Sequence, residues 1–273
     1  PNHVKEKVSI ITINFNNCQG LEATIKSVIK QNTRNFEYII IDGGSTDGSV
    51  DVIKRYSEHI DYWVSESDKG IYNAMNKGIA VARGEYCQFL NSGDWLYDEN
   101  VIDKFNKSPN ETDIILGYTA LSTPKGLVAR ICSNDDISFI NLFRGSIGHQ
   151  SSFIRRSLFT YIPYDEKYKI CSDWKFFLEA LIIHNCTFST VDFTIAYFDL
   201  NGISSTNQKL KTEEKEKILK ELNIPPRILK DYESLDIDTL KIAQKLHPYI
   251  GLRHFVCKLT SYLIQIYKWI SIK

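Results

Sequence analysis

The chain has 273 residues, of which 43% are hydrophobic and 24% charged, and its basic and acidic side chains are equal in number, 33 each. This length and composition are typical of a folded globular protein with one large domain, or with one domain and an appendage, and they exclude a fibrous or disordered chain. The balanced charge indicates no acidic or basic partner for the chain as a whole.

The cysteines and the apolar stretches of the sequence indicate the cellular compartment. The six cysteines include no Cys-x-x-Cys pair, which argues against a zinc ribbon or a thioredoxin-like site and predicts buried thiols in a reducing compartment. The N-terminus carries no apolar signal core, and no apolar stretch has the length of about 18 residues that a membrane-spanning helix needs. We therefore expect a cytoplasmic protein.

Patterns of buried strands and amphipathic helices alternate through the first 95 residues. This alternation is typical of an open, mostly parallel α/β sheet flanked by helices. The expected strands are residues 8–15, 37–42, 60–65 and 86–90, and the expected helices are residues 21–30, 49–57 and 71–82.

The pattern is less regular after residue 95. A helix is expected over residues 173–184, and helix is again expected from residue 208 onward, interrupted by Pro225-Pro226 and Pro248. Further strands are expected over residues 113–121, 127–131, 151–154 and 188–198.

Polar and acidic residues lie directly at the ends of three of the expected strands. The second strand runs into Asp42-Gly-Gly-Ser-Thr-Asp47, the fourth into Asn91-Ser-Gly-Asp94, and the first ends among asparagines that include Asn14 and Asn16. Ligands of parallel α/β sheets bind beyond the carboxyl ends of the strands. These ends therefore predict a site for a cation and a phosphorylated ligand, although Asp47 has a plain alternative role as a helix cap.

Three further segments carry candidate chemistry. Asp68-Lys69 precedes an expected helix, where a cation suits a diphosphate, although a solvated lysine is the alternative. His149 is either a site residue or a structural histidine. Asp173, beside Trp174, is either a general base or an acid at a helix N-terminus.

Several common catalytic motifs are missing from the sequence. It contains no Gly-x-Gly-x-x-Gly, Walker loop, His-Glu-x-x-His or Gly-x-Ser-x-Gly segment. Their absence argues against dehydrogenases, NTPases, zinc proteases and esterases.

The order of the motifs resembles the family 2 glycosyltransferases with the GT-A fold, of the type that assembles bacterial surface polysaccharides. The resemblance covers about residues 8–205, and its segments are 8–16, 41–48, 67–78, 84–94, His149-Gln150, Ser172-Asp173 and 202–205. It implies a Rossmann-like, mostly parallel sheet in a catalytic domain over residues 1–206. The nucleotide-binding half would be residues 1–95, the acceptor-binding half residues 96–206, and a helical region would follow over residues 207–273.

The resemblance also implies an activity. A hexosyl or N-acetylhexosaminyl unit would pass with inversion from a nucleotide sugar to a hydroxyl of a saccharide or lipid-linked saccharide, with Mn²⁺ or Mg²⁺ as cofactor. UDP is the carrier expected from the family, with GDP and dTDP left open. Asp173 would be the base and Asp94 the metal carboxylate. The nucleotide-sugar site would contain Thr12, Asn14, Asn16, Asp42, Asp68, Lys69, Asn91 and Ser92, and the acceptor or phosphate side would contain His149, Gln150, Ser204 and Ser205.

One residue departs from the family pattern. Asn91 stands where the family carries the first acid of its Asp-x-Asp motif. An amide can bond a ribose hydroxyl but adds no charge, so the metal site would depend on Asp94 and the diphosphate and would be weak.

The C-terminal segment over residues 250–273 combines an apolar helical stripe with basic and aromatic neighbours, and no acidic residue follows Asp238. It predicts a helix packed on its own domain or on a second subunit of a homodimer. The alternative is a peripheral contact with the inner face of the cytoplasmic membrane. Because the aromatics lie beside a continuous apolar stripe, we expect no nucleic-acid partner.

Two other functions compete with sugar transfer. A nucleotidyltransferase would be expected to have a basic, glycine-rich loop after the first strand, and residues 14–17 contain no such loop. A catalytically silent nucleotide-sugar-binding module would not need the two acids Asp94 and Asp173, and both are present.

Overall fold

The computed structural model describes residues 7–109, 111–123, 126–130, 137–198, 207–234 and 258–259. The chain divides into two compact units, Pro1–Leu222 and Asn223–Lys273. The expected boundary at residues 206/207 lies before this division. That expected boundary adjoins residues 199–206, which are not described.

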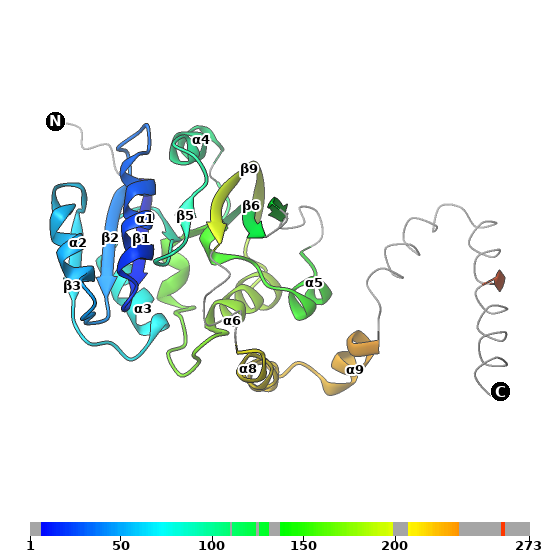
Figure 1. Ribbon diagram of the computed structural model, residues 1–273. Coiled ribbons are helices and arrows are strands. Elements are labelled where there is room, and N and C mark those ends of the chain that lie inside the picture. Colours follow the sequence, from blue (N-terminus) through cyan, green and yellow to red (C-terminus); the bar gives the residue numbers. More distant parts are fainter. Residues whose placement is uncertain are drawn as a thin grey trace. The chain divides into compact units, whose positions relative to one another are not determined.

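The first half of the sheet is parallel, with strand order β3-β2-β1-β4. Strands β1 and β2 are buried along their whole length, as their runs of valine and isoleucine require when both faces of a sheet are covered. Figure 1 shows β1, β2 and β3 side by side at the N-terminal end of the unit. The elements are β1 (Val8–Asn14), α1 (Cys18–Ile29), β2 (Glu37–Asp42), α2 (Ser49–Arg55), η1 (Ser57–His59), β3 (Tyr62–Ser65), α3 (Ile71–Val81) and β4 (Tyr86–Phe89).

Helices cover both faces of this parallel half. Leu21 and Ile25 of α1 belong to the same core cluster as Ile10 and Ile40, which share one face of the strands. Helix α3 packs on the opposite face, where a Cβ added to Gly78 would lie 2.5 Å from Ile11 Cγ2. A glycine at this position therefore lets the helix approach β1 closely.

The second half extends the sheet in the order β4-β8-β6-β9-β5, with β7 paired to β6. Strands β6 and β9 are parallel, whereas β4/β8, β8/β6, β9/β5 and β6/β7 are antiparallel. The expected α/β class with a GT-A-like sheet is confirmed. The described strands make four parallel and four antiparallel pairs, so the sheet is mixed and not mostly parallel as expected, and all the antiparallel pairs belong to this half. The elements are β5 (Trp95–Leu96), α4 (Val101–Lys107), β6 (Ile114–Thr123), β7 (Gly126–Arg130), α5 (Phe139–Arg144), η2 (His149–Ser151), β8 (Ser152–Arg155), η3 (Arg156–Thr160), α6 (Ser172–Leu178), η4 (Glu179–Ile183) and β9 (Phe188–Phe198).

The helix expected over residues 173–184 has two geometries. It is α-helical as α6 up to Leu178 and then π-helical, with the amide of His184 donating to the carbonyl of Glu179 at 2.8 Å. The π turn follows the α-helical first turn that carries Asp173, so the base candidate itself lies in regular helix.

Helix α8 (Gln208–Glu221) completes the first unit, and the side chain of Asn207 caps it by accepting from the Leu210 amide at 3.1 Å. The second unit contains α9 (Pro226–Ser234). Within the described ranges, no helix has both the length and the apolar character that crossing a bilayer requires. Of residues 250–273 only Lys258 and Leu259 are described, so a membrane or subunit contact through this segment stays a prediction.

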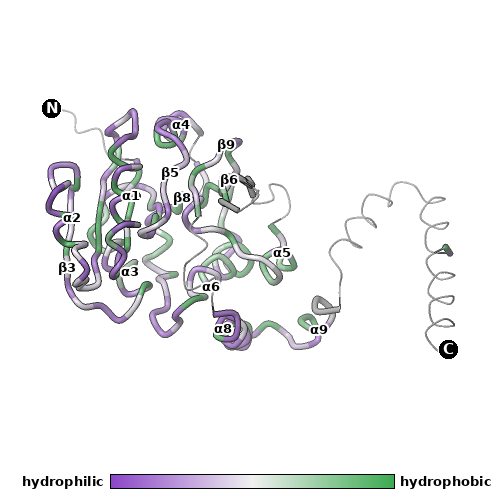
Figure 2. The backbone as a smooth tube through the Cα atoms, viewed as in Figure 1, coloured by the Kyte–Doolittle hydropathy of each residue, from purple (hydrophilic) through white to green (hydrophobic). Residues whose placement is uncertain are grey.

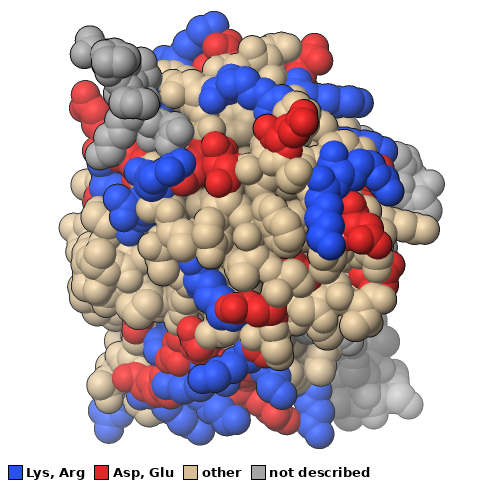
Figure 3. Space-filling model, turned by 90° about the vertical axis from the view of Figure 1, so that its left-hand side faces the viewer, with Lys and Arg blue, Asp and Glu red and all other residues tan. Residues whose placement is uncertain are grey.

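The surface agrees with the balanced composition. On the face drawn in Figure 3, acidic and basic side chains lie close to one another. The four described cysteines are free thiols: Cys87 and Cys171 are buried, whereas Cys18 and Cys186 are half-buried. Burial raises the pKa of Cys87 and of Cys171 to about 12, so neither is a nucleophile at neutral pH.

Candidate active site

Asp42 organises the turn that follows β2. Its carboxylate is wholly buried and accepts from Asn14 Nδ2 (2.7 Å), Ser45 Oγ (2.6 Å), Ser65 Oγ (2.6 Å) and the amides of Ser45 (2.9 Å) and Gly44 (3.2 Å). Burial favours the neutral acid, but these hydrogen bonds outweigh it and lower the pKa of Asp42. The carboxylate therefore holds the turn, and contact with a base stays a prediction.

The first strand brings two of its three predicted residues to this turn. Asn16 adopts a positive φ of 48° and accepts from the Thr46 amide at 2.9 Å, while Asn14 bonds to Asp42 and Ser45. Thr12 lies deeper: its side chain is fully buried and its hydroxyl is 3.2 Å from that of Tyr38. It supports the sheet and does not face the rim.

Asp47 connects the first turns of α1 and α2. It accepts from the Cys18 amide at 2.8 Å and from the Ser49 amide at 3.1 Å. The interpretation of Asp47 as a helix-terminal acceptor is therefore confirmed.

Asp68 reaches the Asp42 turn from the next loop. A Cβ added to Gly43 would lie 2.7 Å from Asp68 Oδ2 and 3.2 Å from the ring of Phe15, so the three residues meet at the rim. Phe15 is 64% exposed, which is unusual for a large apolar side chain next to a buried strand. Lys69 follows on the exposed surface of the same loop.

The segment Asn91–Asp94, which follows β4, is held by α1 and its N-terminal cap. Asn17 Nδ2 donates to the carbonyl of Ser92 at 2.9 Å, and Thr24 Oγ1 donates to the carbonyl of Asp94 at 2.6 Å. Asp94 is 4% exposed. Its position is therefore determined by helix contacts to the backbone around it.

Asp173 lies in the first turn of α6, and its carboxylate is bound from three sides. Oδ1 accepts from the Tyr72 hydroxyl (2.8 Å) and the Trp174 amide (2.9 Å), and Oδ2 lies 3.1 Å from His149 Nδ1. Burial raises the pKa of Asp173, but His149 and the other donors outweigh it and lower the pKa below its ordinary value. The group is therefore ionised at neutral pH.

His149 joins the Asn91–Asp94 segment after β4 to Asp173. Its Nε2 lies 3.1 Å from Asn91 Nδ2, so a neutral ring protonated on Nδ1 donates to Asp173 and accepts from Asn91. Burial lowers the pKa of His149, but Asp173 and, more weakly, Asp94 outweigh it, and the pKa is raised. Asn91 Oδ1 is buried without a partner in the described part of the chain, and it would serve a protonated Nε2 after an amide flip.

Gln150 bonds within the sheet and not to Asp173 or Asn91 in the described part of the chain. Gln150 is 4% exposed, and its carbonyl accepts from Gln88 Nε2 at 3.0 Å inside the sheet layer. Ser204 and Ser205 lie outside the described residues.

The oxygen donors of the Asn91–Asp94 segment after β4 fit a metal that is mostly held by other ligands. No group of three or more His, Cys, Asp or Glu side chains converges in the described ranges. The Asp94 carboxylate and the unpartnered Asn91 Oδ1 are both hard oxygen donors. Such a pair suits Mg²⁺ or Mn²⁺ bound chiefly by phosphate oxygens and water, and not a fully protein-ligated ion.

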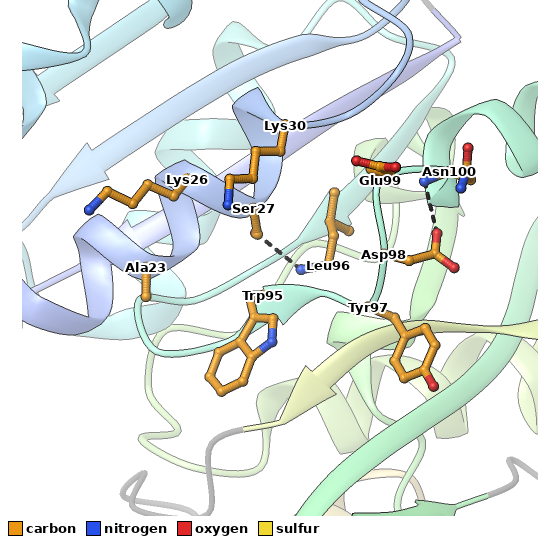
Figure 4. Close-up of a pocket in the computed structure, with 10 residues that line it drawn as sticks. All are labelled: Ala23, Lys26, Ser27, Lys30, Trp95, Leu96, Tyr97, Asp98, Glu99 and Asn100. Carbon is orange, nitrogen blue, oxygen red and sulfur yellow. Dashed lines mark hydrogen bonds between the residues drawn. The ribbon is translucent and has the colours of Figure 1, made fainter.

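A pocket of about 540 Å³ lies elsewhere, between α1 and residues 95–100 (Figure 4). Lys26 and Lys30 line it from the helix, and Trp95 and Tyr97 line it from the other side. Both rings stack on Tyr197 with centroids 5.1 Å apart. No predicted site residue is among those that line it, so the candidate chemistry lies at the strand ends and not in this pocket.

Comparison with known proteins places the chain in a family. The model described as glycosyl transferase family 2 matches residues 9–158. An uncharacterized glycosyltransferase of Mycobacterium tuberculosis is 34% identical over 209 residues, which cover 72% of this chain and 77% of the relative. The chain belongs to glycosyltransferase family 2. A PGL/p-HBAD biosynthesis glycosyltransferase of Mycobacterium bovis is 28% identical over 206 residues, covering 72% and 79%.

Solved structures share the fold of this glycosyltransferase. Residues 1–349 of Staphylococcus aureus TarS, in complex with UDP-GlcNAc, match with a TM-score of 0.65 and 18% identity over 78% of this chain and 64% of that one. The mannosyltransferase PcManGT of Pyrobaculum calidifontis, in complex with GDP-Man and Mn²⁺, matches with a TM-score of 0.54 and 15% identity, covering 70% and 56%. The glycosyltransferase thus spans less than two thirds of either structure, and the likeness shows a GT-A-like fold.

Three residues of this glycosyltransferase that lie at or support the site were not predicted from the sequence. Phe15 interrupts the polar exit of β1, which was a usable signal. Tyr72 gives no signal because it contacts Asp173 only across 101 residues of sequence. Glu214 lies in a helix rich in exposed charges, so its burial cannot be read from the pattern.

Proposed function

We propose that this glycosyltransferase transfers a hexosyl or N-acetylhexosaminyl unit, with inversion, from a UDP-sugar to a hydroxyl of a saccharide or lipid-linked saccharide. The observation that carries the proposal is the Asp173 carboxylate, joined through His149 to the Asn91–Asp94 strand end. The relatives named for glycolipid biosynthesis and for nucleotide-sugar complexes support a role in bacterial surface polysaccharide or glycolipid synthesis.

The donor would lie on the rim of the parallel half. The exposed Phe15 ring offers a face for a base to stack on, and Asp68 beside it offers acceptors for base or ribose groups. Lys69 would interact with a phosphate, since it precedes the N-terminus of α3. Asp42 would act by holding the turn that these groups share.

Asp173 would take the proton of the acceptor hydroxyl at Oδ2. Oδ1 already accepts two hydrogen bonds, whereas among the described residues Oδ2 bonds to His149 Nδ1 and keeps a lone pair for the incoming proton. The oxygen would then attack the anomeric carbon on the face opposite the diphosphate. A single displacement of this kind inverts the anomeric configuration.

Asp94 and Asn91 would hold a divalent cation whose charge stabilises the departing diphosphate when it is bound. Because only one of the two residues is charged, we expect the cation to bind weakly without nucleotide and tightly with it.

A donor panel tests the proposal. The full chain would be incubated with UDP-, GDP- and dTDP-sugars, with and without Mn²⁺ or Mg²⁺, while donor hydrolysis and thermal stability are followed. We expect one nucleotide class to raise the unfolding temperature and to be hydrolysed slowly, with metal strengthening both effects. Stabilisation without turnover, even with saccharide acceptors, would favour the silent binding module. A folded protein that responds to no nucleotide sugar would refute sugar transfer.

The pH dependence of transfer tests the His149–Asp173 pair. A protonated His149 weakens Asp173 as a base, so the rate should rise with pH as His149 loses its proton. Because the pKa of His149 is raised, we expect the midpoint of this acid limb to lie above the ordinary value of 6.5. In His149→Asn the midpoint should fall toward the range of a carboxylate. An unchanged midpoint in that variant would separate His149 from the titration.

A further inference from the structure

Helix α8 is largely hydrophilic, as Figure 2 shows, but its inner face is closely packed in the first unit. Glu214 on that face is only 4% exposed, as buried as the apolar side chains Ile218 and Leu219 next to it. Burying a carboxylate is costly unless it is fully hydrogen-bonded. The hydrogen-bond partners of Glu214 therefore show which segment helix α8 fixes in place.

Glu214 binds three successive backbone amides. Oε1 accepts from the amide of Lys169 at 2.7 Å, and Oε2 accepts from the amides of Ile170 and Cys171 at 2.9 Å each. Hydrogen bonds to an ionised acceptor are about twice as strong as neutral ones. These amides belong to the segment that enters α6 at Ser172, one residue before Asp173.

The same segment is held from the other side by α3. The Tyr72 hydroxyl lies 2.6 Å from the carbonyl of Ile170 and 2.8 Å from Asp173 Oδ1. The backbone before Asp173 is thus fixed by Glu214, while its carboxylate is fixed by Tyr72 and His149. A shift of this segment would move the carboxylate relative to the strand end that carries Asp94.

Helix α8 also contacts the two residues that follow Asp173. Lys215 Nζ lies 4.5 Å from the centroid of the Trp174 ring and donates to the carbonyl of Gly145 at 3.1 Å. Glu221 lies 3.4 Å from Lys175 Nζ. In Figure 1, α8 lies next to α6. This helix lies beyond residues 9–158, so the family match does not include it.

We propose that Glu214 is a positioning residue for the base, which makes α8 part of the catalytic unit. The inference rests on the proposed function, because it assigns Glu214 a role through Asp173. A misplacement of about 1 Å at a reacting group can lower a rate by about 100-fold. The three amides are the contacts through which α8 would prevent that misplacement.

The test compares Glu214→Gln with Glu213→Gln in the full chain. Both remove one negative charge from adjacent positions of α8, but Glu213 is exposed. We expect Glu214→Gln to lower kcat by about 10- to 100-fold, with the donor KM within about twofold, because the donor binds on the parallel half. Glu213→Gln should match the wild type.

Several results would overturn the inference. They are a kcat for Glu214→Gln equal to that of Glu213→Gln, an equal loss of donor affinity and kcat, or a Glu214→Gln chain that circular dichroism shows unfolded at the assay temperature. Each would mean that Glu214 only stabilises the fold. Glu214→Asp keeps the charge but is one methylene shorter, and it should recover part of the lost kcat. If the wild type and Glu213→Gln also lack transfer, the proposed function itself fails.

Discussion

Replacing Asp173 with asparagine should lower sugar transfer by about 10²- to 10⁴-fold, the usual contribution of a general base, while donor binding is preserved. Asparagine has nearly the same shape and can still accept from Tyr72 and the Trp174 amide through its oxygen. It cannot take a proton from the acceptor, and its amide nitrogen would face His149 Nδ1. Steady-state kinetics and donor titration calorimetry on the same preparation would measure the two effects.

A surface aspartate provides the matched control. Asp103 lies on α4 and pairs with Lys107 at 2.7 Å on the exposed surface. Asp103→Asn should leave both transfer and donor binding within about twofold of the wild type, because exposed ion pairs contribute little. Transfer by Asp173→Asn at a rate close to that of this control would show that the base lies elsewhere.

Replacing Asp42 with alanine should destabilise the fold by about 3 kcal/mol or more, since removal of a buried acceptor leaves its donors unpaired. Asn14, Ser45 and Ser65 would each lose a hydrogen bond to it, together with two backbone amides. Urea unfolding would measure the free energy of unfolding. Asp51→Ala on the exposed face of α2 should change it by only about 0.5 kcal/mol.

The effect of Asp42 should depend on pH in a defined direction. Its folded-state pKa is lowered below the ordinary value of 3.8, so its contribution is fully present above that value. The contribution is lost as the pH falls through the lower, folded-state pKa. The difference in stability between the wild type and Asp42→Asn should therefore shrink on acidification. A constant difference would mean that the charge of Asp42 adds nothing to its hydrogen bonds.

Asn91, which departs from the expected family pattern, contacts His149 in the structure. The family resemblance predicts an acid where Asn91 stands in this sequence. In the structure, its amide lies 3.1 Å from His149 and can donate to a neutral ring or accept from a protonated one. A carboxylate at this position would favour only the protonated ring. The amide therefore keeps His149 free to change its protonation state beside Asp173.

Local patterns were sufficient for the parallel half of the fold. Strands β1 and β2 are covered on both faces, so their continuous apolar runs are visible without any knowledge of their partners. The order of short motifs from residue 8 onward likewise predicted the glycosyltransferase family before the comparisons showed it. The pairing of β6 with β7, β8 and β9 was not predictable, because strand direction in a mixed sheet depends on partners far along the chain.

The sequence by itself determined the family, the α/β class and the acids Asp42, Asp94 and Asp173 as candidates, since each follows from residue types at short spacing. Only the tertiary structure decided how these residues are used. In the structure the Asp42 carboxylate is buried, and the Thr12 hydroxyl lies next to that of Tyr38. Asp173 is bonded to Tyr72 and His149, and the backbone before it is bonded to Glu214. The physical reason is that the contacts of Thr12, Asp173 and Glu214 span 24 to 101 residues of sequence, so no local pattern encodes them.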